Sequence, residues 1–444
     1  MSIEPMWSKN ITFVNGEVAL SGIPVSQLAR EFGTPTFFLD EDAFRSRAIA
    51  WRDGLKAEFG ENAGHIFYAS KAFTCTAVAH WISEIGIGID ACTGGELAVA
   101  LAGGVSPSMI EIHGNNKSVA EINRAVEIGV KTIVVDSLFE IERVADAARK
   151  YGKRQAILIR LTPGIEAHTH ESISTAHEDV KFGFSIASGG AWSAVEKISG
   201  IAELELRGVH CHIGSQIFGT EAFEIAADRL IAFMAKYRDS YGAVLPELDL
   251  GGGFGIAYLP NEETVEPSDA VPAIGIAVRK ACAKYSLELP LVSLEPGRNI
   301  VGPTMFTLYE VGTVKDVVVE DGSVRKYISV DGGMSDNART ALYDAEYFAC
   351  IAQRSSSAPS VQSRLVGKHC ETGDIIIRDI QLPSDVAPGD LIATPATGAY
   401  GRSMASNYNH VPRPPVVAVI DGKARVIVRR ETEADLLALD VAKM

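Results

Sequence analysis

Several polar residues in this sequence directly follow short apolar runs, and Lys71 is the first of them. The stretch HIFYASKAF contains an apolar run, predicted to be a buried strand, that ends on this lysine. Lysine is rarely buried without a partner. A lysine amine can act as a nucleophile on carbonyl compounds when it is partly desolvated or lies near other cations. The alternative is a surface lysine whose stem covers apolar area.

Seven further apolar runs end in a similar way. The residues at or just after the eight ends are, in chain order, Lys71, Asp90, His113, Asp136, Arg160, His212, Gly251 to Gly253 and Glu295. In a closed parallel barrel the carboxyl ends of the strands form one face, and catalytic groups lie there. We therefore expect these residues to share a site.

Two glycine-containing turns follow the last two runs. DLGGGFG places Gly251, Gly252 and Gly253 just past Asp249, and EPGRN contains Gly297. Glycine permits positive φ and a close backbone approach, so that N–H groups can converge on an anion. Phosphate sites in such barrels often follow strands seven and eight. The two turns together predict a phosphate site, whereas either turn alone is more often structural.

A reactive lysine and a phosphate site in one cavity indicate pyridoxal 5′-phosphate (PLP), an aldehyde that enzymes bind through a lysine amine. Glu295 fits this cofactor, because a carboxylate beside the pyridine nitrogen keeps that nitrogen protonated. The protonated ring can then take up electrons from a substrate carbon. The alternative is that Glu295 forms an ion pair with Arg298 on the same turn.

His210 and His212 lie two apart on a predicted strand and therefore share one face. Histidine pairs of this kind bind metal in some hydrolase barrels, which makes a metal-dependent hydrolase an alternative function. In those barrels the pair usually lies on the first strand, whereas here it lies on the sixth. A flat imidazole can equally stack on a cofactor ring, which is our interpretation of His212. We expect His210 to be a buried, hydrogen-bonded core residue.

The pattern of elements predicts how these residues are positioned. Between residues 36 and 300 short β-branched runs alternate with helical patterns, which favours a TIM-like (β/α)8 barrel over an open sheet. The expected strands are HIFYAS, GIGID, MIEIHG, TIVVDS, AILIRL, LRGVHCHIG, ELDLGG and LVSLEP. The loop EAHTHESISTAHEDVKFG is long and polar, and such loops are usually functional.

The rest of the chain is predicted to form a second domain of β structure. Residues 301–444 contain β-rich runs separated by turn residues, which is typical of a sandwich or small barrel. Residues 1–35 contain the hairpin-like ITFVNGEVAL and are assigned to the same β domain. This domain is expected to contribute to the active site and to a dimer interface once the resemblance described below is considered.

Composition excludes some classes of partner. The formal net charge of −15 disfavours binding to nucleic acid or to an anionic membrane, because like charges repel. No apolar run reaches the roughly 20 residues that span a bilayer, and the N-terminus lacks the pattern of a secretory signal. The six cysteines form no CxxC motif, which argues against a disulfide framework and a structural zinc site. We expect a cytoplasmic protein.

The motifs together resemble the diaminopimelate decarboxylase family, within the alanine racemase-like (fold type III) PLP-dependent decarboxylases. The resemblance runs from about residue 67 to about residue 413. The segments that carry it are FYASKA, GGELAVAL, HGNNKS, AHTHESISTAHEDVKFGFS, GVHCHIGSQI, DLGGGFGI, EPGRNIVG, VDGGMSDNARTALY, GKHCETGD and GAYGRSMASNYN.

This resemblance implies roles for named residues. Lys71 is implied to bind the cofactor covalently, His212 to stack on its ring and Glu295 to pair with its nitrogen. The implied phosphate and cofactor contacts are Ser215, Gly252, Gly253, Gly297, Arg298 and Tyr400. The implied substrate contacts are Arg298, Arg339, Tyr343, Glu371 and Tyr400. In the family the active site lies at a homodimer interface, which implies that Cys370 and Glu371 complete the site of the partner subunit.

The implied reaction is the decarboxylation of meso-2,6-diaminopimelate to L-lysine and CO2, the last step of lysine biosynthesis. Lys71 and Cys370 both remain candidates for the proton donor to Cα. Arg298 and Arg339 can hold the distal carboxylate by charge-assisted bonds, while Glu371 pairs with the distal ammonium. Lysine lacks that carboxylate, and sites built around such a group can reject the lacking analogue by ~10^4-fold.

Two alternatives to this function remain besides the metal-dependent hydrolase. One is a decarboxylase of the same fold that acts on ornithine, lysine, arginine or a carrier-bound amino acid. The other is a non-catalytic binding protein, against which the presence of Lys71, Glu295, Cys370 and Glu371 argues.

Overall fold

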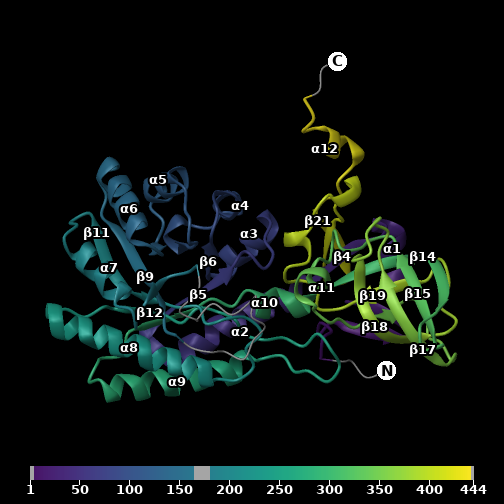
Figure 1. The fold of residues 1–444 in the computed structure, drawn as a ribbon, viewed down its shortest axis with the longest axis horizontal. Helices are drawn as coiled ribbons and strands as arrows, with labels where there is room; N and C mark the ends of the chain where they lie inside the picture. Colours follow the sequence, from purple (N-terminus) through teal and green to yellow (C-terminus); the bar gives the residue numbers. More distant parts are fainter. Residues whose placement is uncertain (1–4, 165–180, 442–444) are drawn as a thin grey trace. The chain divides into compact units, whose positions relative to one another are not determined.

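The chain folds into two compact units (Figure 1). The structure, a computed structural model, describes residues 5–164 and 181–441. The barrel unit comprises Arg47–Gly255 and Val265–Asn299, and the β unit comprises Met1–Ser46, Ile256–Thr264 and Ile300–Met444.

The barrel unit is built on a closed parallel sheet. Within the described residues, the strands of its closed ring are β5 (Ala63–Ala69), β6 (Gly88–Ala91), β7 (Ile110–Ile112), β8 (Thr132–Val135), β9 (Gln155–Thr162), β11 (Leu204–His210), β12 (Glu247–Asp249) and β13 (Leu291–Leu294), and the short β10 (Phe184–Ser185) also pairs with β9. Each strand pairs with the next in parallel, and β13 pairs with β5, so the ring closes. The prediction of a (β/α)8 barrel with these eight strands is confirmed.

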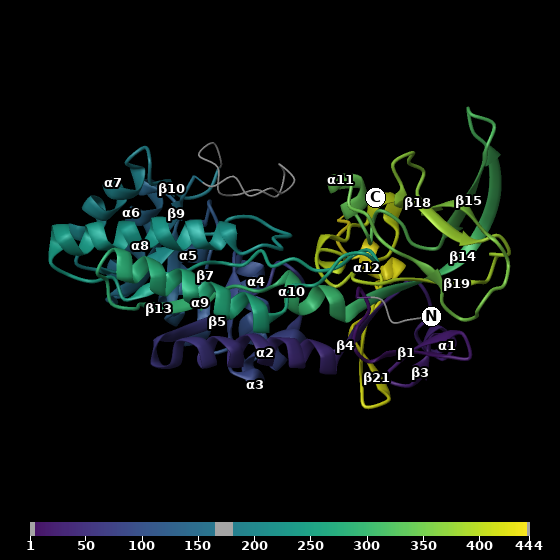
Figure 2. The same cartoon turned by 90° about the horizontal axis from the view of Figure 1, so that it is seen from below.

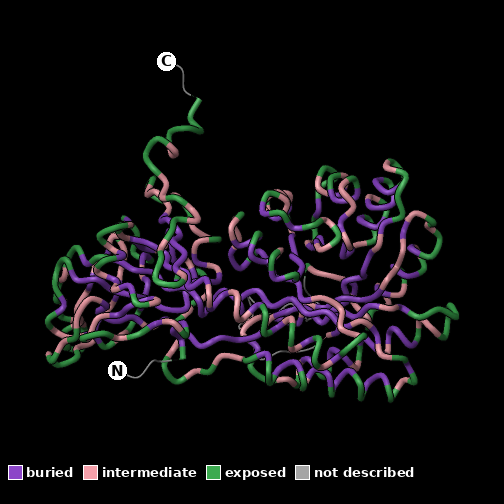
Figure 3. Tube along the Cα trace, turned by 180° about the vertical axis from the view of Figure 1, so that it is seen from behind, coloured by how far each residue is buried: buried purple, intermediate pink, exposed green. Residues whose placement is uncertain are grey.

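Amphipathic helices connect the strands. They are α3 (Thr76–Ile85), α4 (Gly94–Ala102), α5 (Val119–Ile128), α6 (Leu138–Lys150), α7 (Gly190–Ser199), α8 (Glu221–Tyr241) and α9 (Pro267–Lys284), preceded by α2 (Glu41–Phe59). In α5, for example, Ile122, Ala125 and Val126 are buried at helical spacing while the charged positions face solvent. Figure 2 shows α8 and α9 running side by side, and Figure 3 shows the buried strands within the exposed outer faces of the helices.

Side-chain caps fix where three of these helices begin. Thr93, Ser118 and Ser137 each accept a hydrogen bond from the backbone N–H three residues later. Ser118 forms a full capping box with Glu121, an arrangement that satisfies two otherwise unpaired N–H groups. Because each cap closely follows a strand, the loop at the carboxyl end of that strand is short and fixed at both ends.

The β unit contains a branched sheet of nine strands in the described residues. They are β4 (Thr36–Asp40), β14 (Met305–Val318), β15 (Val324–Val330), β16 (Cys350–Ile351), β17 (Ser360–Val366), β18 (Ile375–Pro383), β19 (Leu391–Thr394), β20 (Val416–Ile420) and β21 (Lys423–Val428). The hairpin expected near the N-terminus is present as β1 (Ile11–Val14) and β2 (Glu17–Leu20), and β3 (Ile23–Pro24) extends it. Its buried residues join the core of this unit.

The units are divided differently from the predicted ranges of 36–300 and 301–444. Strand β4 pairs with β14 and β20, so residues 36–46 belong to the β unit, as do residues 256–264. All five residues of β4 are buried. Its apolar sequence therefore resembles that of a barrel strand, and for this reason the predicted barrel range included it. Most of the long polar loop, namely residues 166–180, lies outside the described residues. No helix in the described ranges is long and apolar enough to cross a membrane.

Candidate active site

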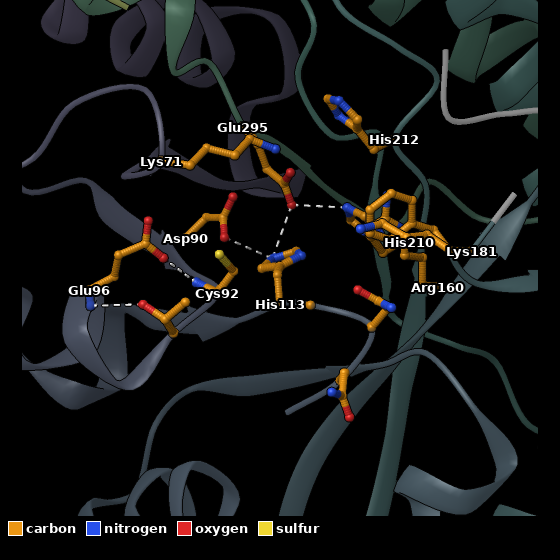
Figure 4. A pocket seen from close by; sticks show the side chains of 15 residues that line it. Lys71, Asp90, Cys92, Glu96, His113, Arg160, Lys181, His210, His212 and Glu295 are labelled. Carbon is orange, nitrogen blue, oxygen red and sulfur yellow. Dashed lines mark hydrogen bonds and ion pairs between the residues drawn. The ribbon is translucent and has the colours of Figure 1, made fainter. Parts of the chain in front are cut away.

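A pocket of about 380 Å³ opens at the carboxyl ends of the barrel strands (Figure 4). Its lining includes six of the polar residues predicted at strand ends, namely Lys71, Asp90, His113, Arg160, His212 and Glu295. Asp136 instead accepts hydrogen bonds from the backbone N–H of Gly183, at 2.8 and 3.0 Å. The topology therefore brings together residues that are more than 200 positions apart in the sequence.

Lys71 lies two residues beyond the end of β5 and lines this pocket. Its side chain is exposed to the cavity, so it is not part of the apolar core. Figure 4 shows it extending toward Glu295. The strand thus delivers an amine into a shared cavity, as the sequence predicted.

Glu295 is buried between two histidines. Its Oε1 lies 3.2 Å from Nε2 of His113 and 3.0 Å from Nε2 of His210. Although burial raises the pKa of the Glu295 carboxyl, His113 and His210 hold it below its ordinary value. Glu295 is therefore ionised at neutral pH, and both histidines lie within 3.2 Å of its Oε1.

The two histidines differ in charge. Although burial opposes it, the nearby carboxylates of Asp90 and Glu295 raise the pKa of His113 to about 9. Burial lowers the pKa of His210 to about 4, against the attraction of Glu295. At neutral pH His113 is consequently a cation and His210 is neutral. Burial, with Lys71 and Arg160 nearby, also lowers the pKa of His212 well below its usual value, so His212 is neutral too.

His210 is fully buried, as expected, but it also lines the pocket. Its Nε2 lies 3.0 Å from Oε1 of Glu295, and neither ring nitrogen makes an aligned hydrogen bond within the described residues. Within the described residues, His210 lies close enough to His113 and Glu295 for the three to hold a metal ion. The metal hypothesis had instead paired His210 with His212. His210 and His212 therefore have different surroundings, although they are only two residues apart.

The glycine turns form a tight cradle beside the pocket residues. Gly251 and Gly253 have φ of +70° and +103°, which other residues adopt only with strain. A Cβ on Gly252 would lie 2.2 Å from the carbonyl oxygen of Glu295, and one on Gly253 would lie 2.3 Å from that of Gly214. The N–H of Gly252 donates to Nδ1 of His212 at 3.3 Å, which fixes the imidazole against the turn.

Two further predicted residues meet across this cradle. Nη2 of Arg298 donates to Oγ of Ser215 at 2.9 Å, which joins the loop after β11 to the turn after β13. Gly297 lies so close to β5, the first barrel strand, that a Cβ on Gly297 would lie 2.8 Å from both the Cβ and the carbonyl oxygen of Ala69. These backbone approaches require glycine and make the two turns parts of one built site.

The remaining predicted residues lie in the β unit. Arg339 is buried, donates from Nη1 to the Tyr347 hydroxyl at 2.6 Å, and lies 4.4 Å from the ring centroid of Tyr258. Tyr343 ends the short helix α11 (Arg339–Tyr343), and Tyr400 has a φ of +60°. Cys370 and Glu371 are exposed in the segment between β17 and β18.

The pocket also contains residues to which the sequence analysis gave no role. His113 was expected at a strand end but was given no role, and Asn115 and Asn116 follow it in the motif HGNNKS. Their position directly after a buried strand was the available signal. Cys92, Thr93 and Glu96, in the loop and first turn after β6, are further lining residues.

Comparison with known proteins identifies the family of the chain. Residues 41–302 match the family model described as pyridoxal-dependent decarboxylase, pyridoxal binding domain. Diaminopimelate decarboxylase of Mycobacterium tuberculosis is 52% identical over 441 residues, with 98% of each chain covered. That of Bacillus subtilis is 42% identical, with 96% of each chain covered.

Solved structures of diaminopimelate decarboxylases are similar to this chain over nearly its whole length. Diaminopimelate decarboxylase from M. jannaschii, in complex with L-lysine, superposes with a TM-score of 0.89 at 30% identity and 98% coverage of both chains. The Helicobacter pylori protein, also complexed with L-lysine, gives a TM-score of 0.84 at 31% identity, covering 94% of this chain and 98% of its own. The chain therefore belongs to the pyridoxal-dependent decarboxylase family, in its diaminopimelate decarboxylase group.

Proposed function

We propose that this protein is a PLP-dependent lyase that converts meso-2,6-diaminopimelate to L-lysine and CO2, the last step of lysine biosynthesis. The observation that carries the proposal is that Lys71, His212 and Glu295, which follow three different strands, line one cavity. The neighbouring glycine cradle and the nearly full-length match to diaminopimelate decarboxylases support the same conclusion.

The residues present fit the cofactor. Oε1 of Glu295 is buried without an aligned hydrogen bond in the described residues, at the lining of a pocket that contains a lysine. The glycine turns pack so closely that a Cβ on Gly252 or Gly253 would collide with backbone, and they follow strands seven and eight, where phosphate sites of such barrels often lie. PLP, when bound, supplies an electron sink for the charge left at Cα as CO2 departs.

Each barrel residue then has a distinct task. Lys71 would bind the cofactor aldehyde covalently. Glu295, ionised because His113 and His210 flank it, would pair with the ring nitrogen and favour its protonated form. His212, held by the Gly252 N–H, would help to hold the ring. Because His212 is neutral, it can pack there without placing a second charge beside the ring.

We assign the phosphate to the cradle. Its contacts are proposed to be Ser215, Gly252, Gly253, Gly297, Arg298 and Tyr400. The Arg298–Ser215 hydrogen bond already holds two of these side chains together. Arg298 supplies positive charge, and the Ser215 hydroxyl supplies a polar contact.

Replacing Gly252 with alanine tests the cradle. The new Cβ would lie 2.2 Å from the carbonyl oxygen of Glu295, so the turn must shift. We expect PLP affinity to fall about tenfold or more, in line with the roughly 1–3 kcal/mol cost of an overpacked site. The dissociation constant is measured by titrating the apoenzyme with PLP. Gly200→Ala, whose Cβ would make an ordinary 3.7 Å contact, is the control. Equal affinities in the two variants would contradict the assignment.

The proposed substrate contacts are those that the resemblance implies. Arg298, Arg339, Tyr343, Glu371 and Tyr400 are assigned to the diaminopimelate side chain and carboxylates. Two guanidinium groups favour a substrate with a second carboxylate, because hydrogen bonds to charged groups contribute ~1.5–3 kcal/mol each. Lys71 or Cys370 returns a proton to Cα after CO2 leaves.

We further propose that the protein acts as a homodimer in the cytoplasm. Cys370 and Glu371 are exposed on the isolated chain, which suits residues that complete the site of a partner subunit. All six cysteines lie within the described ranges and are free thiols, as expected in a reducing compartment. No nucleic acid or membrane is needed as a partner.

The direct test of the function is a comparison of substrates. The purified holoenzyme is supplied with diaminopimelate, lysine, ornithine or arginine, and CO2 release is measured. We expect turnover of diaminopimelate to exceed that of the other three by ~10^4-fold in kcat/KM. Equal rates with lysine and diaminopimelate would overturn the assignment of the arginines and favour a decarboxylase of broader specificity.

Glu371→Gln separates substrate binding from cofactor binding. Removing the carboxylate should lower kcat/KM for diaminopimelate roughly tenfold or more, since a charged contact to the distal ammonium is lost. The visible absorbance of the bound cofactor should not change. Glu346→Gln, another exposed carboxylate of the β unit, controls for the loss of charge. A variant that loses cofactor absorbance would show that Glu371 has a different role.

A further inference from the structure

The motif HGNNKS places a buried histidine beside the carboxylate that pairs with the cofactor. His113 directly follows β7 and is 5% exposed, and its Nε2 lies 3.2 Å from Oε1 of Glu295. We propose that His113 is a positioning residue: it is the buried cation that keeps Glu295 ionised and hence able to pair with the ring nitrogen. This inference rests on the proposed function of Glu295.

Charge counting at this end of the barrel supports the proposal. The titratable groups that face His113 are Asp90 on β6, Glu111 on β7, His210 on β11 and Glu295 after β13. The three carboxylates lie 3.9, 3.7 and 3.2 Å from Nε2 of His113, in that order. A buried carboxylate without a counter-ion becomes protonated. Of the two histidines that flank Glu295, His113 is the one surrounded by enough negative charge to remain protonated.

The neighbouring carboxyl groups show what happens where contacts with the imidazoles are longer or fewer. Asp249 lies within the same cluster as Glu111 and Glu295, and burial together with Glu295 raises its pKa well above the ordinary range. Burial similarly raises the pKa of Asp90 to about 6, even though His113 opposes the shift. Glu295, in contrast, has its pKa lowered because His113 and His210 oppose the effect of burial. The pKa values of these buried carboxyls therefore differ according to how closely each carboxyl lies to the two imidazoles.

The loop that carries His113 is rigidly anchored. The backbone N–H of His113 donates to the carbonyl of Ala91 at 2.9 Å. Four residues later Lys117, fully enclosed, donates from Nζ to the carbonyls of Gly114 and Val134 at 2.7 and 2.6 Å and to Glu140 at 2.9 Å. All three ammonium hydrogens are thereby used within the barrel, so the lysine of HGNNKS fixes the loop and presents its histidine to Glu295.

A protonation measurement on the protein without cofactor tests the pair directly. The imidazole nitrogens of His113 are followed by NMR over a pH titration of the apoenzyme, with His113→Asn used for assignment. We expect His113 to titrate near pH 9 and to titrate at a lower pH in Glu295→Gln. Titration near the ordinary value of ~6.5, or no change in Glu295→Gln, would overturn the proposal. This result does not depend on which reaction the enzyme catalyses.

Kinetics of His113→Asn then test the consequence. Without the cation the pKa of Glu295 rises, so the carboxyl is partly protonated at neutral pH and ionises again as the pH increases. We expect kcat to fall roughly tenfold or more near neutral pH, with the deficit shrinking as the pH is raised. In the Glu295→Gln background the same substitution should cost nothing further, because contacting residues that act together are non-additive.

A control variant and a contrary outcome complete the kinetic test of His113. His65→Asn alters another partly buried barrel histidine that does not line the pocket, and it should leave the kinetics unchanged. A loss in His113→Asn that is independent of pH and adds to that of Glu295→Gln would show that His113 has a merely structural role. A holoenzyme that turns over no diaminopimelate, with the NMR result intact, would instead overturn the proposed function alone.

Discussion

Replacing Lys71 with alanine is expected to abolish the visible absorbance of bound PLP and to lower kcat by roughly 10^4-fold or more. Removal of a covalently acting side chain can cost this much because the remaining site cannot replace its bond. Lys71 stands at the end of the first barrel strand and extends into the pocket toward Glu295 (Figure 4). Absorption spectra and CO2 release on the reconstituted protein measure both effects.

A matched lysine controls for nonspecific effects. Lys56 is exposed on α2, outside the pocket lining, so Lys56→Ala should retain the absorbance and the turnover of the unmodified protein. If Lys71→Ala behaved like Lys56→Ala, the lysine at the mouth of the barrel would have no covalent role. The interpretation of Lys71 as a snorkelling residue would then be preferred.

Glu295→Gln is expected to have the second largest effect. The amide keeps the shape of the side chain but removes the negative charge that favours a protonated ring nitrogen. We expect kcat to fall by roughly 10^2–10^3-fold, the range found when one preorganised electrostatic contact is removed. The cofactor should remain attached, because Lys71 is unchanged, and its absorbance therefore reports whether the variant is correctly loaded.

The comparison variant for this charge is Glu142→Gln. Glu142 is an exposed carboxylate of α6 that pairs with Lys197 on the barrel surface. It should show normal kinetics, because exposed ion pairs contribute little. A Glu295→Gln enzyme that kept its full kcat with PLP bound would contradict the role assigned to the buried carboxylate.

The sequence was sufficient to predict the barrel strands and the residues that end them. Lys71, His212 and Glu295 follow apolar runs that could be identified from composition and periodicity alone, and the fold then brings them into one pocket. This succeeded because a parallel barrel places every strand end on one face. The topology of the barrel predicts that the strand ends lie close together, which no local sequence pattern could show.

Other features depended on contacts between distant residues and could not be predicted in this way. Strand β4 has the apolar sequence of a barrel strand, and its place is decided by pairing with β14 and β20. His210 is buried as expected, but its place in the pocket beside Glu295, 85 residues later, depends on a contact that the sequence does not show. The charge of His113 likewise follows from carboxylates on other strands.

The most direct measurement is the mass of the peptide that contains Lys71 after the holoenzyme is reduced with borohydride and digested. Reduction makes a lysine–cofactor linkage permanent, so we predict a pyridoxyl-phosphate group on Lys71 and on no other lysine. An unmodified Lys71, or the group attached to a different lysine, would contradict the site on which the proposed reaction depends.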